Sequence, residues 1–170
     1  DIEEAYKLGE EYFDNFIKDK TVFSRVTPLD KLHIVESYKR MGEFVGTQPP
    51  LGYIKAPENC HQLLPDPDSM QIIKDMFAWR LSGESVTAIA RKLNESGIPS
   101  PMQYRIEKGM EKNTKYKDVQ WDGGSVSCIL RNPVYIGDME QGYQKGALYK
   151  GIPDHRQKKE QRIYVKDTHE

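Results

Sequence analysis

The chain has 170 residues, which is enough for one domain with its own core and a smaller appendage. Apolar residues make up 37% and charged residues 30%, and no apolar run approaches the ~20 residues that a membrane-spanning helix needs. The formal net charge of −1 hides a gradient, from −4 over residues 1–30 through −1 over residues 31–90 to +4 over residues 91–170, so we expect a polyanion to bind at the positive end.

The first predicted element is an amphipathic helix over residues 2–20. Its apolar positions repeat at spacings of four and three, opposite an acidic face, and form an aromatic stripe of Ile2, Tyr6, Gly9, Phe13 and Phe16. We expect this stripe to pack on its own domain. The alternative is that the stripe binds a partner chain.

A second helix and a linker follow. Thr27 and Pro28 suit the cap and the first turn of a helix over about Leu29–Met41, which Gly42 ends. Residues 42–53 then contain three glycines and two consecutive prolines. This composition indicates a linker of fixed course.

A hairpin and a third helix come next. Residues 53–55 and 62–64 read as two short strands around a polar, proline-containing turn. Asp66 and Pro67 then suit the cap and the first position of a helix that ends at Gly83. We expect this helix to bury Met70, Ile73, Met76, Phe77 and Leu81.

Two short helices with complementary apolar faces form the next feature. Ser85 caps the first and Gly97 ends it, and its apolar face consists of Val86, Ile89, Ala90 and Leu93. Asp122 caps the second helix, which covers about Gly123–Arg131. Its inward-facing side chains are Val126, Ile129 and Leu130. The pair predicts a split helix-turn-helix in which the first helix braces the second. The insertion between them runs from Pro99 to Gln120, and its polar, basic residues 102–120 are predicted to be an exposed, mobile excursion.

Strands are predicted over Val134–Glu140 and near Arg162–Val165, with a turn over Gln141–Gly146. Trp121 and Tyr53 are expected to be packing anchors. The predicted fold class is α+β, a helical domain with a split helix-turn-helix-like pair and small antiparallel β elements, preceded by one or two N-terminal helices.

The second helix of the pair carries the residues best suited to contact a nucleic acid. Gly123 and Gly124 leave backbone N–H groups at the helix start open to a phosphate, which the helix dipole also favours. Ser125 and Ser127 are short donors. Arg131 shares an exposed stripe with Ser127 and could reach a phosphate or a guanine edge. Arg131 could instead cap the carbonyls at the end of its own helix.

The sequence predicts no metal, cofactor or catalytic site. Cys60 and Cys128 lie far apart without a CxxC pair, and the adjacent Cys60 and His61 point to opposite faces of an extended stretch. Asp66 and Asp68 are paired carboxylates, but no histidine, phosphate-binding glycine loop or nucleophile motif accompanies them. We therefore expect no stand-alone enzyme.

Three blocks of sequence resemble a known family. GEFVGTQPPLGY, FAWRLSGESVTAIARKLNESGIPSP and W…SVSCILRNPVYIGDMEQG, in this order, resemble the recombinase domain of large serine recombinases, the integrases and transposases of phages and mobile elements. The resemblance runs from about Leu29 to the end of the chain. The family's linker is matched by Gly46, Pro49, Pro50, Gly52 and Tyr53. Its recognition-helix block is matched by Trp121, Ser125, Val126, Ile129, Leu130, Asn132, Pro133, Tyr135 and Gly137.

The resemblance implies a non-catalytic domain that binds one half of a double-stranded DNA attachment site. A separate domain of the parent recombinase would carry the serine nucleophile, and a zinc-bearing domain would add contacts. The linker would lie along the minor groove, with Thr47 and Gln48 as contacts. The basic residues that would neutralise phosphates are Arg91, Arg105, Lys108, Lys112, Lys115 and Lys117. The lysines would equally suit a solvated loop.

The expected organisation is an unplaced N-terminal helical segment over residues 1–28, a helix and linker over residues 29–52, and a DNA-binding domain over residues 53–170. We expect a bacterial or phage-encoded cytoplasmic protein without membrane contact. Its expected partners are double-stranded DNA, the other domains of the parent and further copies of itself on DNA. The alternative is a protein-interaction or regulatory domain that uses the aromatic stripe of residues 2–20.

Overall fold

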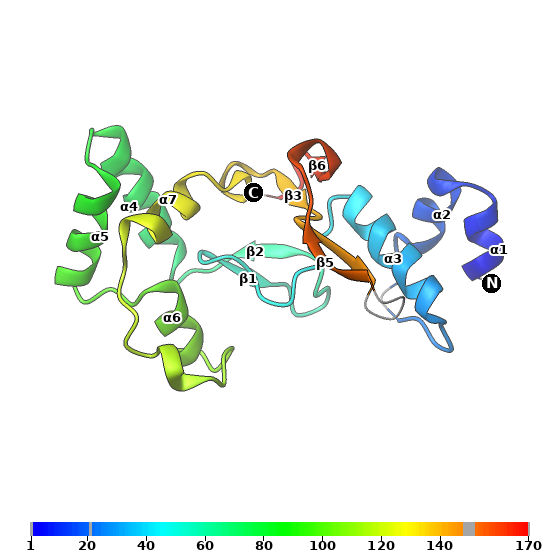
Figure 1. The fold of residues 1–170 in the computed structure, drawn as a ribbon, viewed down its shortest axis with the longest axis horizontal. Coiled ribbons are helices and arrows are strands. Elements are labelled where there is room, and N and C mark those ends of the chain that lie inside the picture. The colour runs from blue at the N-terminus through cyan, green and yellow to red at the C-terminus, as the bar shows by residue number, and fades with distance from the viewer. Residues whose placement is uncertain (1, 21, 148–151, 170) are drawn as a thin grey trace. The chain divides into compact units, whose positions relative to one another are not determined.

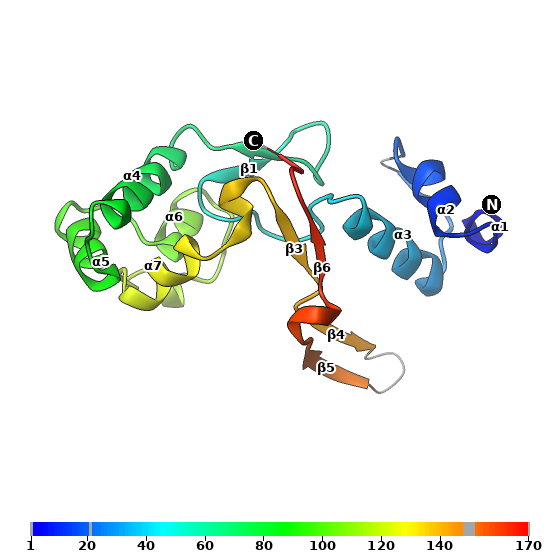
Figure 2. The same ribbon diagram turned by 90° about the horizontal axis from the view of Figure 1, so that it is seen from above.

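The computed structural model describes residues 2–20, 22–147 and 152–169, and its helices and strands are drawn in Figure 1 and, turned, in Figure 2. The chain divides into two compact units. Unit 1 consists of Asp1–Thr47, Lys55–Leu64 and Ile136–Glu170. Unit 2 consists of Gln48–Ile54 and Pro65–Tyr135. Helices combined with small two-stranded sheets confirm the predicted α+β class.

Unit 1 begins with two short helices, α1 (Ile2–Lys7) and α2 (Glu10–Ile17), in place of the single helix that the sequence predicts. Gly9 separates them with a φ of +107°, a conformation that residues with a Cβ rarely adopt. The prediction of one helix was wrong because glycine fits the spacing of a helical stripe and also breaks a helix without steric cost.

The third helix of unit 1, α3 (Pro28–Arg40), carries the predicted cap. The Thr27 hydroxyl accepts the Asp30 N–H at 3.2 Å, and the Asp30 carboxylate accepts the Thr27 N–H at 2.8 Å. The core of this part of unit 1 consists of Ala5, Phe13, Ile17, Ile34 and Tyr38, with Ile2, Tyr6 and Phe16 partly buried around it. The aromatic stripe therefore packs on its own unit, as expected, and the fully buried Phe13 is not available to a partner chain.

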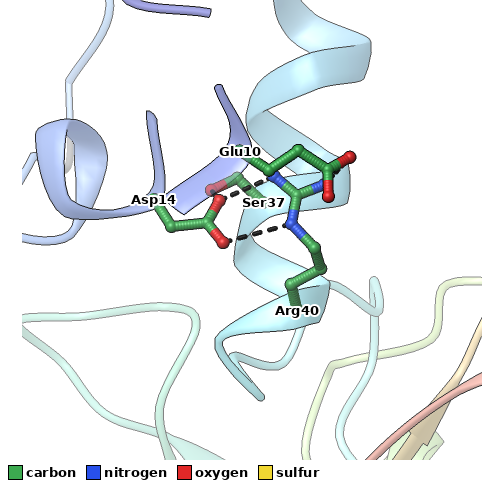
Figure 3. Close-up of polar contacts among 4 residues, drawn as sticks. All are labelled: Glu10, Asp14, Ser37 and Arg40. Carbon is green, nitrogen blue, oxygen red and sulfur yellow. Dashed lines mark hydrogen bonds and ion pairs between the residues drawn. The ribbon is translucent and has the colours of Figure 1, made fainter. Parts of the chain in front are cut away.

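An ion pair joins α2 to α3 beside this core. The Arg40 guanidinium donates to both carboxylate oxygens of Asp14, at 2.6 and 3.1 Å, and the Ser37 hydroxyl donates to the same carboxylate (Figure 3). Glu10 lies 3.4 Å from the guanidinium. Burial alone would raise the pKa of the Asp14 carboxyl, but the bonds from Arg40 and Ser37 and the charge of Arg40 together lower it.

Short antiparallel strand pairs complete unit 1. β3 (Met139–Gln141) pairs with β6 (Ile163–Val165), with Glu140 opposite Tyr164, and this confirms the predicted strand near the C-terminus. β4 (Gln144–Ala147) pairs with β5 (Ile152–Arg156), where the sequence predicts only a turn. A further 3-10 turn, η4, covers Lys159–Gln161.

The predicted strand over Val134–Glu140 was wrong for most of its length. A 3-10 turn, η2 (Pro133–Ile136), occupies its first half, and Gly137 follows with a φ of +84°. Three apolar residues after a proline suit a tight turn as well as a strand, and their spacing alone does not separate the two.

Unit 2 is helical. It contains α4 (Met70–Leu81), α5 (Val86–Glu95), α6 (Pro101–Glu107), the 3-10 turn η1 (Thr114–Tyr116) and α7 (Gly123–Leu130). Its core consists of Leu51, Ile73, Met76, Ile89, Ala90, Leu93, Tyr104, Trp121, Val126 and Ile129. The predicted hairpin is present as β1 (Tyr53–Lys55) paired with β2 (Leu63–Pro65). No helix in the described part of the chain is long and apolar enough to cross a membrane.

Two predictions for unit 2 were wrong. α4 begins at Met70 and not at Pro67, because the carboxylate of Asp66 accepts the Asp68 N–H and holds the intervening residues in a turn. Leu81, expected in the core, is the last residue of α4 and is 88% exposed.

The predicted exposed excursion over residues 102–120 was wrong for its first residues, which belong to α6. The cap of α6 is a reciprocal pair between Ser100 and Gln103, with Pro101 at the first helical position. Tyr104 of α6 is buried in the unit 2 core. Part of the excursion is therefore an element of the core and not a solvated loop.

Candidate nucleic-acid interface

The predicted helix pair is present in unit 2, where α5 and α7 pack against each other. The Ser85 hydroxyl caps α5 by accepting the Ala88 N–H at 3.1 Å, as predicted. Buried faces of both helices contribute to one core, which includes Ile89 and Leu93 from α5 and Val126 and Ile129 from α7. α5 therefore braces α7 through apolar contacts.

Trp121 fixes the entry of the chain into α7. It is 4% exposed, and its indole N–H donates to the Ile98 carbonyl at 3.0 Å. The side chain of Asn94, on α5, accepts the Trp121 N–H and donates to the Trp121 carbonyl, both at 2.9 Å. The expectation that Trp121 is a packing anchor is confirmed, and so is that for Tyr53, which is 5% exposed.

Gly123 lies against α5. A Cβ atom at Gly123 would be 3.3 Å from the Thr87 hydroxyl and 3.5 Å from a methyl group of Val86. Such a contact is tighter than side chains usually allow. The missing side chain of Gly123 thus lets α7 approach α5, and this packing role was not predicted from the sequence.

The start of α7 already holds an anionic group, the carboxylate of Asp122. It accepts the Ser125 N–H at 2.6 Å, while the Ser125 hydroxyl accepts the Asp122 N–H at 3.1 Å. The backbone bond from Ser125 is the main cause of the lowered pKa of the Asp122 carboxyl. The predicted cap is confirmed, and a phosphate at this helix end would meet a carboxylate.

The solvent-facing stripe of α7 is formed by Gly124, Ser127, Cys128 and Arg131. These residues lie at helical spacings of three and four, so they share one face. The Nε group of Arg131 donates to the Ser127 carbonyl at 3.2 Å, which is the capping contact that the sequence left open. Among the described residues, no hydrogen-bond partner is found for the two terminal nitrogens of this guanidinium, which remain exposed.

The basic side chains between α5 and α7 differ in how they are bound. Arg105 donates to the Pro49 carbonyl at 3.4 Å, and Lys108 pairs with Asp68 at 2.5 Å. Lys115 lies above the ring of Tyr116, with 5.7 Å to its centroid.

The remaining predicted contacts are on the surface. Lys112 and Lys117 are exposed and form no ion pair with any described residue. Arg91 lies 3.9 Å from Glu95 in an exposed pair. Thr47 is exposed, and the side-chain amide of Gln48 donates to the Met110 carbonyl at 3.1 Å. Unit 2 therefore carries every predicted contact residue except Thr47, which is the last residue of its segment of unit 1.

The positive charge of unit 2 is concentrated in one segment. Unit 2 as a whole has ten basic and nine acidic residues. Residues 101–117 hold five of the basic and two of the acidic ones. A local excess of +3 on a nearly neutral unit gives a polyanion a defined place to bind. The described residues contain no group of three His, Cys, Asp or Glu side chains that could hold a metal ion.

An α+β chain with a braced, capped helix and a basic segment beside it agrees with the family that the sequence resembles. A family model described as Recombinase matches residues 67–170, which is more than half of the chain. The chain belongs to the Recombinase family, and its role is in site-specific recombination. In large serine recombinases this domain is non-catalytic. Comparison with curated proteins and comparison with solved structures each give no match.

Proposed function

We propose that unit 2 is the DNA-recognition module of a site-specific serine recombinase and that it binds one half of the attachment site through α7. The observation that carries this proposal is the two-sided character of α7. One face is buried against α5, and the other presents Gly124, Ser127, Cys128 and Arg131 to solvent. A helix held in this way can enter a major groove without losing its packing.

The dimensions of α7 limit how much sequence it reads. Eight residues make a helix of about 12 Å at 1.5 Å per residue. This length spans about three to four base pairs at ~3.4 Å per base pair. Arg131 is the only long side chain of the stripe. The short side chains around it allow close approach, and Arg131 supplies a donor pair suited to O6 and N7 of guanine.

The basic segment supplies affinity that does not depend on sequence. Lys112, Lys115 and Lys117 are exposed, so each can neutralise a phosphate and release condensed counterions. Such contacts fix the position of the module on the duplex, while α7 distinguishes bases. Each phosphate contact should add about 0.9 to the slope of log K against log salt concentration.

The parent protein, in this proposal, carries the catalytic serine in another domain, and further copies assemble with it on the DNA in the bacterial cytoplasm. A module that reads three to four base pairs binds modestly alone. Specificity for a full site would therefore come from adding this module to others in the parent.

The test is a selection of bound duplexes from a randomised pool at near-physiological salt, with the wild-type chain and with Arg131→Ala. We expect a reproducible motif, weakened or relaxed by Arg131→Ala at one base pair. The matched control is Arg80→Ala, an exposed arginine of α4 outside the stripe, which should leave the motif unchanged. Salt-sensitive retention without any motif would contradict base reading by α7, and no retention at all would overturn the proposal.

A further inference from the structure

Residues 48–52, the part of the linker that belongs to unit 2, are held by other residues of the same unit. Gln48 donates to the Met110 carbonyl at 3.1 Å, and Arg105 donates to the Pro49 carbonyl at 3.4 Å. Both bonds tie the linker to α6 or to the residues that follow α6. The linker therefore follows a course set by the excursion and not by its own prolines alone.

The second half of the linker is held more firmly. The Tyr135 hydroxyl donates to the Leu51 carbonyl at 2.7 Å. The Gly52 N–H donates to the Ser69 hydroxyl at 3.1 Å, and the Gly52 carbonyl accepts the Asp66 N–H at 2.8 Å. A Cβ at Gly52 would be 2.8 Å from the Ile73 side chain, so the backbone lies directly on the core.

Asp66 is the centre of this arrangement. It is 4% exposed, and its carboxylate accepts hydrogen bonds from the hydroxyls of Ser69 and Tyr104 and from the Asp68 N–H. Burial would raise the pKa of the Asp66 carboxyl, but these three bonds and the charge of Lys108 together lower it. All three donors are neutral. Lys108, the nearby cation, pairs with Asp68.

A buried carboxylate with only neutral donors is stable while each donor is in place. Tyr104 belongs to α6, and Ser69 also accepts the N–H of the linker residue Gly52. Displacing α6 would remove one donor from Asp66, and displacing the linker would disturb another. The position of the linker and the position of α6 are therefore coupled through one side chain.

We infer that Asp66, Ser69 and Tyr104 form a positioning cluster that makes the linker residues 48–50, which precede the buried Leu51 and Gly52, and the basic segment 101–117 a single surface for the phosphate backbone of duplex DNA. The three residues touch no DNA themselves and act by holding the groups that do. The DNA part of this inference rests on the proposed function. The coupling of linker and α6 does not, and it can be measured without DNA.

The first test is amide hydrogen exchange in the full 170-residue chain, free in solution, for Tyr104→Phe and Ser69→Ala. We expect exchange of the Gly52 amide to accelerate about five- to tenfold in both variants, as the loss of one neutral hydrogen bond predicts. Amides of α5 and α7 should keep their wild-type rates. Tyr116→Phe is the matched control, because Tyr116 is exposed in η1 and should leave Gly52 unchanged. An unchanged Gly52 rate, or an equal acceleration throughout unit 2, would overturn the inference.

The second test uses a fluorescent duplex recovered with the wild-type chain from the random pool, and the same duplex lengthened by about one helical turn, about 10 base pairs, at both ends. Tyr104→Phe should lose about five- to tenfold in affinity for the longer duplex and little for the shorter one. Equal affinities of variant and wild type for both duplexes, or equal losses on both, would overturn the shared surface. A wild-type chain that recovers no duplex from the pool would instead overturn the proposed function, while the exchange result would still decide the coupling.

Discussion

Asp14 in unit 1 and Asp66 in unit 2 are both carboxylates with little exposure to water, but the two find different partners. Asp14 accepts from the guanidinium of Arg40 and from a hydroxyl, so its charge is balanced within the unit. Asp66 accepts from two hydroxyls and one backbone N–H, and the nearby cation, Lys108, pairs with Asp68 and acts on Asp66 only through its charge. The charge of Arg40 still acts on Asp14 when a hydrogen bond lengthens, whereas a hydrogen bond from a hydroxyl to Asp66 is lost when its donor moves away.

The two carboxylates hold different kinds of structure in place. The pair in unit 1 fastens one helix to another, α2 to α3, next to a core that both helices share. The cluster in unit 2 fastens an irregular segment that has no core of its own, the linker. Residues without regular backbone hydrogen bonds need side-chain partners if their course is to be fixed. We therefore expect the stability of unit 1 to fall when the cation beside Asp14 is removed. In unit 2 we expect the linker to be held less firmly when a single hydroxyl is removed.

The largest effect should come from the core of unit 2. Leu93 is fully buried, and Leu93→Ala should lower the free energy of unfolding by about 2–5 kcal/mol. Both tryptophans of the chain, Trp79 and Trp121, belong to unit 2, so their fluorescence in urea reports this unit. Leu81→Ala is the control, since Leu81 is 88% exposed and should leave the midpoint unchanged. A similar shift in both variants would mean that burial does not distinguish the two positions.

Three of the four predicted helix N-caps are correct, because a cap depends on a few neighbouring residues; the fourth, Asp66, does not cap α4, which begins at Met70. Thr27, Ser85 and Asp122 all cap the helices assigned to them. The same rule would have found α6, because Ser100, Pro101 and Gln103 form a complete capping signal. The basic composition of the following residues concealed that signal.

Features that depend on distant residues were not predictable. The bond between Tyr104 and Asp66 joins positions 38 residues apart, and no local pattern marks either of them. The contact of Gly123 with Thr87 likewise exists only once α5 and α7 pack. The exposed stripe of α7 was predicted because helical periodicity alone determines which residues share a face. Which of those residues contact DNA depends on the partner and stays a prediction.

The next largest effect should come from the ion pair of unit 1. Arg40→Met keeps the apolar stem and removes the cation from Asp14. Both side chains are about one-fifth to one-quarter exposed, so we expect a loss of about 1–3 kcal/mol, below that of a fully buried pair. Far-UV circular dichroism in urea measures it. Lys7→Met removes the cation of an exposed pair with Glu3, and a comparable loss there would show that surface and partly buried pairs are equivalent in this chain.

A smaller effect is expected at the start of α5. Ser85→Ala removes the hydroxyl that accepts the Ala88 N–H, and the expected loss of stability is about 1 kcal/mol by tryptophan fluorescence in urea. Ser96→Ala makes the same change at the other end of the same helix, where the residue is exposed, and should be neutral. Equal losses at the two ends would contradict a capping role for Ser85.

The smallest effect should be the pH dependence that Asp66 gives to unit 2. The pKa of its carboxyl is lowered in the folded chain, because its hydrogen bonds and the charge of Lys108 outweigh burial. A lowered pKa means that the folded state binds fewer protons than the unfolded state, so the contribution of Asp66 is present above the ordinary pKa of ~3.9 and is lost as pH falls through the folded value. Because burial cancels part of the effect of the bonds on this pKa, the free energy of unfolding should change only slightly with pH.

Asp66→Asn should therefore flatten the acid limb of the stability curve of unit 2, measured by tryptophan fluorescence in urea between about pH 5 and pH 2. Asp75→Asn, on the surface of α4, is the control and should keep the wild-type slope. A steeper acid limb in Asp66→Asn would mean that the folded carboxyl has a raised pKa, as burial without adequate donors would produce. That result would contradict the contrast between the two units, since a poorly solvated Asp66 could not hold the linker.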